Sequence, residues 1–120
     1  MAEESRSTEV VSTRAARNVE IAALDARTIS TAAPLLRTIG HALRLRILDF
    51  LDRSGAAQRV TEIVAAVDAE QAVVSQQLKV LRDENRLAAE RRGNCVYYRI
   101  IDKDIASVLN FLRHEPFATP

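Results

Sequence analysis

Side chains that suit contacts with DNA recur on one face of the segment that begins at residue 71. Val74, Leu78 and Leu81 have helical spacing and predict a helix that buries this apolar stripe. The opposite face carries small or polar side chains: Gln71, Ala72, Ser75, Gln76 and Lys79. Glutamine can hydrogen-bond adenine twice, serine can bond a base or a phosphate, and lysine neutralises phosphate. The segment 71–82 has no acidic residue, whereas a merely solvated helix face usually mixes both signs, so the pattern favours DNA contact.

A second group of candidates lies at the turn of a predicted hairpin. Segments 87–92 and 95–101 have strand character and flank Gly93 and Asn94, which both tolerate a positive φ. Arg91, Arg92 and Asn94 would stand at or beside this turn, where arginine can meet phosphate or enter the minor groove. The alternative is a solvated turn. Tyr97 and Tyr98 should point to opposite faces of their strand, which places one of them in the core.

The elements before the hairpin complete a recognisable motif. A short helix with Thr61 as its N-cap is expected to end near Val67, and residues 68–70 form the turn into the helix from Gln71. Two helices joined by a tight turn and followed by a two-stranded wing form a unit that docks in the major groove. The fold class is therefore mainly α with a β-hairpin wing, a winged helix-turn-helix.

The flanking segments are predicted to carry this unit. We expect a helix from Val19 to near Thr31, a new helix with Pro34 in its first turn, and another from about Ala42 to Arg53. Asp102 should cap a last helix that ends at Pro116. Residues 1–18 are predicted to be a flexible or partner-ordered arm, 19–116 the folded domain, and 117–120 a tail.

Composition limits the class of protein. The 120 residues have a net charge of only +1, but segment 71–100 holds six Lys and Arg against three Asp and Glu, a local net charge of +3. A single cysteine excludes an intrachain disulfide. The sequence has no signal peptide and no apolar run of membrane-spanning length, so we expect a soluble, cytoplasmic protein. It has no phosphate-binding glycine loop, paired-carboxylate motif or catalytic triad pattern, and we expect no enzyme activity.

Three segments together resemble the ArsR/SmtB family of winged-helix repressors. These are residues 36–48, 74–82 and 97–100, and the resemblance covers roughly residues 33–112. It implies a homodimer built on the first and last helices, with two recognition helices about one DNA turn apart on a palindromic operator. It also implies repression of an operon, with release from DNA when an inducer binds.

The resemblance assigns no inducer to this chain. Family members that sense metal through Cys-x-Cys have it in the first motif helix, but residues 58–62 contain no cysteine. In members that bind metal on the last helix, the matching positions here hold Asp102, Asp104, Glu115 and Ala118, with His114 adjacent to them. Zinc prefers about four nitrogen or sulfur ligands, so these are weak candidates, and no metal or other cofactor is expected.

Other readings remain open beside the repressor. Cys95 lies near Arg91 and Arg92, which would favour a thiolate, so a redox-responsive regulator is one alternative. The simpler interpretation of Cys95 is a small strand residue. His41 is expected to be a structural cap or a core contact rather than a ligand. Two further hypotheses remain. One is a protein-interaction module that no longer recognises DNA, and the other is a regulator with an organic or sulfur-containing inducer.

Overall fold

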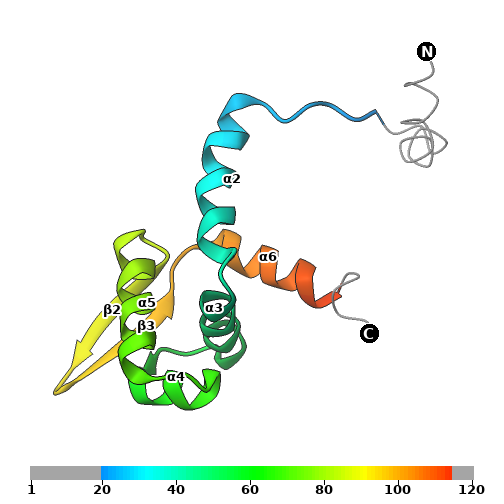
Figure 1. Cartoon of the computed structure of the whole chain (residues 1–120). Coiled ribbons are helices and arrows are strands. Elements are labelled where there is room, and N and C mark those ends of the chain that lie inside the picture. Colours follow the sequence, from blue (N-terminus) through cyan, green and yellow to red (C-terminus); the bar gives the residue numbers. More distant parts are fainter. Residues whose placement is uncertain (1–19, 115–120) are drawn as a thin grey trace. The chain divides into compact units, whose positions relative to one another are not determined.

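The computed structural model describes residues 20–114 of the chain, which divides into two units between Thr31 and Ala32. Figure 1 shows the elements in chain order. They are α2 (Ala26–Ile39), α3 (Ala42–Ser54), β1 (Gln58–Arg59), α4 (Val60–Val67), α5 (Gln71–Asp83), β2 (Leu87–Arg92), β3 (Cys95–Ile100) and α6 (Lys103–His114). The predicted arm, Glu115, Pro116 and the tail lie outside the described residues.

The described part of the first unit begins without regular structure. Residues 20–25 form neither helix nor strand, so the prediction of a helix from Val19 was wrong. Helix α2 begins after Asp25, whose Oδ1 accepts a hydrogen bond from the Thr28 N–H at 2.8 Å. This is the usual way in which an aspartate satisfies an open N–H at a helix start. A side-chain cap therefore set the boundary, which the apolar spacing alone did not show.

Proline 34 does not start a new helix. Helix α2 runs from Ala26 to Ile39 with Pro34 inside it, which contradicts the predicted break near Thr31. Proline lacks the N–H that would bond the carbonyl of the residue four positions earlier. That residue is Ser30, which is exposed, so water can reach its carbonyl. The proline also has the φ that a helix requires, and the helix continues through it.

The second unit packs helices against a small sheet around one aliphatic core. Its fully buried side chains come from α3, α4, α5, β2 and α6: Ile47, Leu48, Ile63, Val74, Leu78, Leu81, Leu87 and Ile105. Tyr98 and Ile100 pack against this core from β3. The mainly helical winged fold is confirmed, including the inward stripe of α5.

Helix α4 begins one residue earlier than its predicted cap. Thr61 is inside the first turn, and the Arg59 N–H donates to Glu62 Oε1 at 2.8 Å. The glutamate at the third helical position thus caps the start, which the Thr61 prediction missed. At the other end Asp68 adopts φ of 54° and closes the helix, so the predicted turn into α5 is confirmed.

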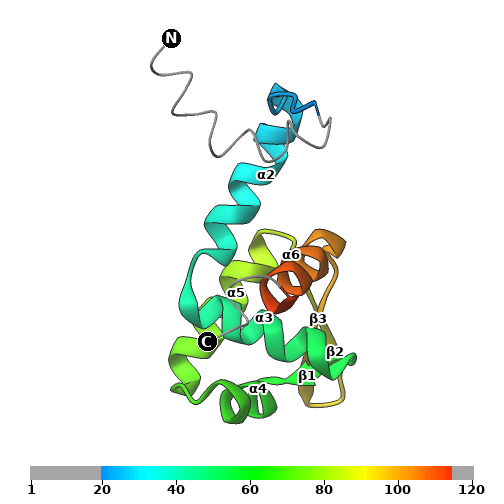
Figure 2. The same ribbon diagram turned by 90° about the vertical axis from the view of Figure 1, so that its right-hand side faces the viewer.

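The wing has three strands where two were predicted. Strand β1 pairs with β3, which also pairs with β2 in the antiparallel order β1-β3-β2. Figure 2 shows β1 beside the hairpin. The hairpin is confirmed, with Arg92 opposite Cys95 at its tip, and β3 ends one residue before the predicted Ile101. Gly93 has φ of 64°, but Asn94 does not have a positive φ, so glycine alone supplies the left-handed conformation of the turn.

Helix α6 is joined to the core at both ends. Asp102 Oδ1 accepts from the Asp104 N–H at 3.0 Å, which confirms Asp102 as the cap. Its other oxygen pairs with Arg86 at 2.5 Å, and both side chains are largely buried. Near the other end, Arg113 pairs with Asp49 at 2.6 Å and with Asp52 at 2.8 Å on α3. These pairs fix α6 against the start of β2 and against α3.

Candidate nucleic-acid interface

Helix α5 separates a buried stripe from an exposed polar face. Val74, Leu78 and Leu81 are completely buried. The five residues of α5 that were predicted for DNA contact are all exposed: Gln71, Ala72, Ser75, Gln76 and Lys79. At 100° per residue they fall within an arc of about 140° that faces away from the core. The structure thus brings these five residues together on one accessible surface.

Two acidic residues at the ends of α5 modify this surface. Lys79 Nζ pairs with Asp83 Oδ2 at 2.8 Å, and both side chains are more than half exposed. Such exposed pairs contribute little to stability because water screens them, so phosphate can compete for the lysine. Glu70 precedes the helix and makes no side-chain cap. Its carboxylate lies where a phosphate would otherwise be attracted to the helix N-terminus.

The tip of the wing exposes the other predicted residues. Arg91, Arg92 and Asn94 are all exposed, and the hairpin that carries them extends away from the helices in Figure 1. Arg92 Nη2 pairs with Glu90 Oε1 at 3.0 Å, and its guanidinium carbon lies 4.6 Å from the ring centre of Tyr97. The stacking on Tyr97 limits the directions that Arg92 can take.

The register of the sheet places Arg91 and Arg92 on opposite faces. Residues opposite each other in antiparallel strands share a face, so Arg92 lies with Cys95, while Arg91 lies with Val96. The Arg92 face also carries Arg59 and Arg99, because Arg59 is opposite Tyr97 and Arg99 follows Tyr97 by two. Sequence reasoning missed these two arginines. Only the pairing of β1 with β3 brings Arg59 to the sheet.

Cys95 lies in this basic part of the sheet. It is a free, half-buried cysteine. A hydrogen bond with Cys95, and next the charge of Glu62, raise the pKa of Arg59 above its usual value. Arg59 rather than Arg91 is thus a direct neighbour of the thiol.

The weak metal candidates are engaged in local structure. Asp102 caps α6 and pairs with Arg86, and His114 Nδ1 lies 2.9 Å from the Asn110 carbonyl. Asp104 is exposed, and Glu115 lies outside the described residues. Within residues 20–114 no cluster of three or more His, Cys, Asp or Glu side chains could hold a metal ion. His41 is the N-cap of α3, with Nδ1 3.4 Å from the Arg44 N–H, as predicted.

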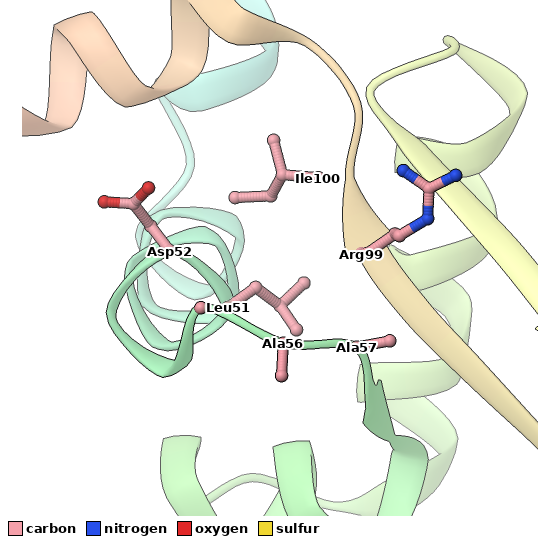
Figure 3. A pocket seen from close by; sticks show the side chains of 7 residues that line it. Leu51, Asp52, Ala56, Ala57, Arg99 and Ile100 are labelled. Carbon is pink, nitrogen blue, oxygen red and sulfur yellow. The ribbon is translucent and has the colours of Figure 1, made fainter.

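A pocket of about 280 Å³ lies between α3, the following turn and β3. Figure 3 shows its lining, in which Arg99 extends across β3 and away from Asp52. Asp52 is already paired with Arg113, and apart from Asp52 and Arg99 the lining residues are small or aliphatic. The pocket therefore lacks converging polar groups that would fix the orientation of a ligand.

The geometry defines a winged helix-turn-helix protein in which one helix face and the tip of the wing are exposed and polar. Within residues 20–114 no helix has the length and apolar content needed to cross a membrane. Residues 41–85 match the family model described as "Bacterial regulatory protein, arsR family". The chain is 34% identical over 94 residues to the HTH-type transcriptional regulator NmtR of Mycobacterium tuberculosis, which covers 78% of this chain and 77% of NmtR. The chain belongs to the ArsR family and is a DNA-binding transcriptional repressor rather than an enzyme.

Solved structures of repressors share this fold. The AntR antimony-specific transcriptional repressor superposes with a TM-score of 0.69 at 33% identity, covering 77% of this chain and 82% of AntR. The transcriptional repressor BigR from Xylella fastidiosa gives a TM-score of 0.68 at 28% identity, covering 72% of this chain and 87% of BigR.

Proposed function

We propose that the chain represses transcription as a homodimer on a palindromic operator, with α5 in the major groove and the wing on flanking phosphates. The observation that carries this proposal is the exposed arc of Gln71, Ala72, Ser75, Gln76 and Lys79, opposite a stripe that is completely buried. Burial of the stripe fixes which face of α5 is presented. The polar arc then meets base edges, while Arg91, Arg92 and Asn94 meet the backbone.

Gln76 is the residue that tests base reading. An amide can bond adenine in two places, and such a contact discriminates by about 1–3 kcal/mol, or roughly 5- to 150-fold. The operator is first selected from source-genome fragments with the purified protein. Gln76→Ala should weaken binding to this selected operator by the same factor and leave binding to a scrambled duplex unchanged. Fluorescence anisotropy on both duplexes measures the two affinities. An equal loss on both would make Gln76 a positioning contact instead.

Arg92 tests the phosphate contact of the wing. Arg92→Ala should weaken binding to every sequence and reduce the slope of log K against log salt by about 0.9. Arg53→Ala is the matched control, because Arg53 is also exposed and pairs with a carboxylate, Asp49, at 2.9 Å on a different surface. The control should leave the slope unchanged. If Arg92→Ala also leaves the slope unchanged, Arg92 does not contact DNA phosphate.

An apolar groove supports the proposed dimer. It has a volume of about 430 Å³ and is lined by residues of α2, α3 and α6: Leu36, Ile39, Leu45, Ser107, Val108, Phe111 and Leu112. Leu36 is 57% exposed, which is unusual for a leucine with so many apolar neighbours. A second copy would cover this surface and place two α5 helices on successive turns of one DNA face.

Charge introduced into the groove tests this arrangement. Leu36→Lys should shift sedimentation equilibrium toward the monomer and reduce operator affinity. Ile101→Lys is the control, since Ile101 is 47% exposed but does not line the groove. A wild-type chain that sediments as a monomer at concentrations that saturate the operator would contradict the homodimer.

The proposal extends to the location of the protein, its release from DNA and its response to oxidation. A repressor that binds chromosomal DNA acts in the cytoplasm, and we propose that location. Release by an inducer is part of the proposal, but no described pocket assigns its chemistry. A redox role of Cys95 stays a prediction, and oxidation followed by the same anisotropy assay would test it.

A further inference from the structure

A chain of polar contacts connects α5 to the helices behind it. Arg44 on α3 donates from Nε to Gln77 Oε1 on α5 at 2.8 Å. Its Nη1 donates to the Thr38 carbonyl near the end of α2, at 3.3 Å. One guanidinium therefore bridges three helices. Its donors have a fixed planar geometry, so the two bonds constrain direction as well as distance.

Thr38 extends this contact to the end of α5. Its side chain is the only buried polar or charged one within residues 20–114, with 2% of the residue exposed. The hydroxyl lies 3.0 Å from the Pro34 carbonyl and also contacts Glu84 Oε1. A hydroxyl has one proton, so these two acceptors share it. Glu84 is the C-cap residue of α5, so α5 is held both at Gln77 and at its end.

The side of α5 that contacts Arg44 is distinct from the side that carries the proposed base-reading arc. Gln77 is half-buried and directly follows Gln76, which is exposed in the proposed base-reading arc. At 100° per residue, the direction of Gln77 differs from that of the arc centre by about 170°. A bond on this side resists rotation of α5 about its axis, and such a rotation would move every residue of the arc together. Precise readout requires placement within about 0.5 Å.

We propose that Arg44 is a positioning residue for DNA recognition, which acts through Gln77 and, with Thr38 and Glu84, fixes the rotation of α5. The inference rests on the proposed function in that α5 reads the bases. Arg44 itself does not contact DNA in this proposal. Arg44 sets the ratio of specific to non-specific affinity, whereas Lys79 and the wing supply the overall electrostatic attraction to DNA.

A direct phosphate contact by Arg44 would give a different pattern. In that case Arg44→Lys keeps the charge and most of the affinity, and Arg44→Met lowers the salt slope by about 0.9. Under the positioning proposal, lysine loses the paired donors, so both variants lose specificity and neither changes the slope. Gln77→Leu removes the acceptor for Arg44 Nε, and Thr38→Val removes the contact of the Thr38 hydroxyl with Glu84 but keeps the Thr38 carbonyl. Neither variant alters a positive charge.

The experiment compares anisotropy on the selected operator and on a scrambled duplex of equal length, over a salt series and well below the melting temperature. The proteins are wild type, Arg44→Met, Arg44→Lys, Gln77→Leu, Thr38→Val and the double variant of Arg44→Met with Gln77→Leu. We expect Arg44→Met and Gln77→Leu each to reduce the specificity ratio about tenfold, which is about 1.4 kcal/mol. This is close to the usual value of a hydrogen bond to a charged group. The double variant should be no worse than either single variant.

Several results would overturn the inference. One is an unchanged specificity ratio in folded Arg44→Met, or, if that variant does not fold, in folded Gln77→Leu. Another is recovery by Arg44→Lys together with a reduced slope, which would assign Arg44 to phosphate. Full additivity in the double variant would show that the two side chains do not act as one unit.

A wild-type protein without sequence preference would instead contradict the proposed function, and the contact is then tested in the free protein. Hydrogen exchange of α5 amides should become about tenfold faster in Gln77→Leu, while exchange in α4 stays unchanged. Equal acceleration of both helices would overturn the positioning role.

Discussion

The buried pair of Arg86 and Asp102 allows a prediction in which a second mutation restores stability. The side chains are 17% and 13% exposed, and Arg86 Nη1 lies 2.5 Å from Asp102 Oδ2. Arg86 Nε is also buried and has no hydrogen-bond partner within the described residues. Asp102→Asn keeps an oxygen for the Asp104 N–H, so the cap of α6 survives. What it removes is the negative charge opposite the guanidinium.

The expected cost follows from this geometry. Removing one member of a fully buried pair costs about 3–5 kcal/mol, because the remaining charge is uncompensated. The residual exposure of both side chains reduces this to about 2–3 kcal/mol. Replacing both partners by neutral side chains is often neutral, so the double variant of Arg86→Met with Asp102→Asn should recover at least about 1 kcal/mol relative to Asp102→Asn alone.

Urea unfolding followed by far-ultraviolet circular dichroism measures these free energies. Protein concentration must be identical in all samples, because association of folded chains raises the apparent stability. Asp104→Asn is a control that changes a nearby exposed carboxylate, and it should stay within about 0.5 kcal/mol of wild type. A double variant as unstable as the sum of its two single variants would refute the reasoning about an uncompensated charge.

Three further predictions concern the same unit. Burial alone would raise the pKa of Asp49, but hydrogen bonds from Arg113 and Arg53 outweigh burial and lower the pKa below 3.8. The ionised Asp49 therefore contributes stability that is present above about pH 4 and lost below it. The free energy of unfolding, measured from pH 6 to pH 3, should fall less for Asp49→Asn than for wild type. Gly55 has φ of 65° and nothing within 4 Å of an added Cβ, so Gly55→Ala should cost about 1–2 kcal/mol from backbone strain alone, measured by urea unfolding against Ala56→Ser as a neutral control. Ile47 is completely buried, so Ile47→Val should cost about 0.5–1.5 kcal/mol by the same measurement, and a neutral result would show that the core repacks around the lost methylene.

The sequence predicted the elements whose side chains repeat over several turns. The helical spacing of Val74, Leu78 and Leu81 predicted the buried side of α5, and all three side chains are fully buried in the structure. The hairpin was also predictable, since its turn contains a glycine that takes a positive φ. Strand β1 was missed because two residues are too few to show alternation. Pro34 misled the prediction because a helix can accept proline where solvent reaches the carbonyl left unpaired.

The candidate site likewise has a part that the sequence predicted and a part that only the structure shows. Exposure of the polar arc followed directly from the buried stripe, since the two lie on opposite sides of one helix. The bond from Arg44 to Gln77 had no sequence signal, because the two residues are 33 positions apart and neither has an unusual local context. Arg59 was likewise missed, because only the register of β1 against β3 places it on the wing. Local periodicity thus gives the faces of elements, and tertiary contacts decide which side chains meet.

The two arginine–aspartate attachments of α6 have a consequence for assembly. Both lie within a single chain, one near each end of the helix, and the middle of α6 lines the apolar groove. The surface offered to a second copy is thus preorganised, and little conformational entropy remains to be lost on association. The two ends differ in exposure, with Arg113 about twice as exposed as Arg86. High salt should therefore loosen the Arg113 end of α6 first, so that the rigidity of the dimer surface depends on ionic strength.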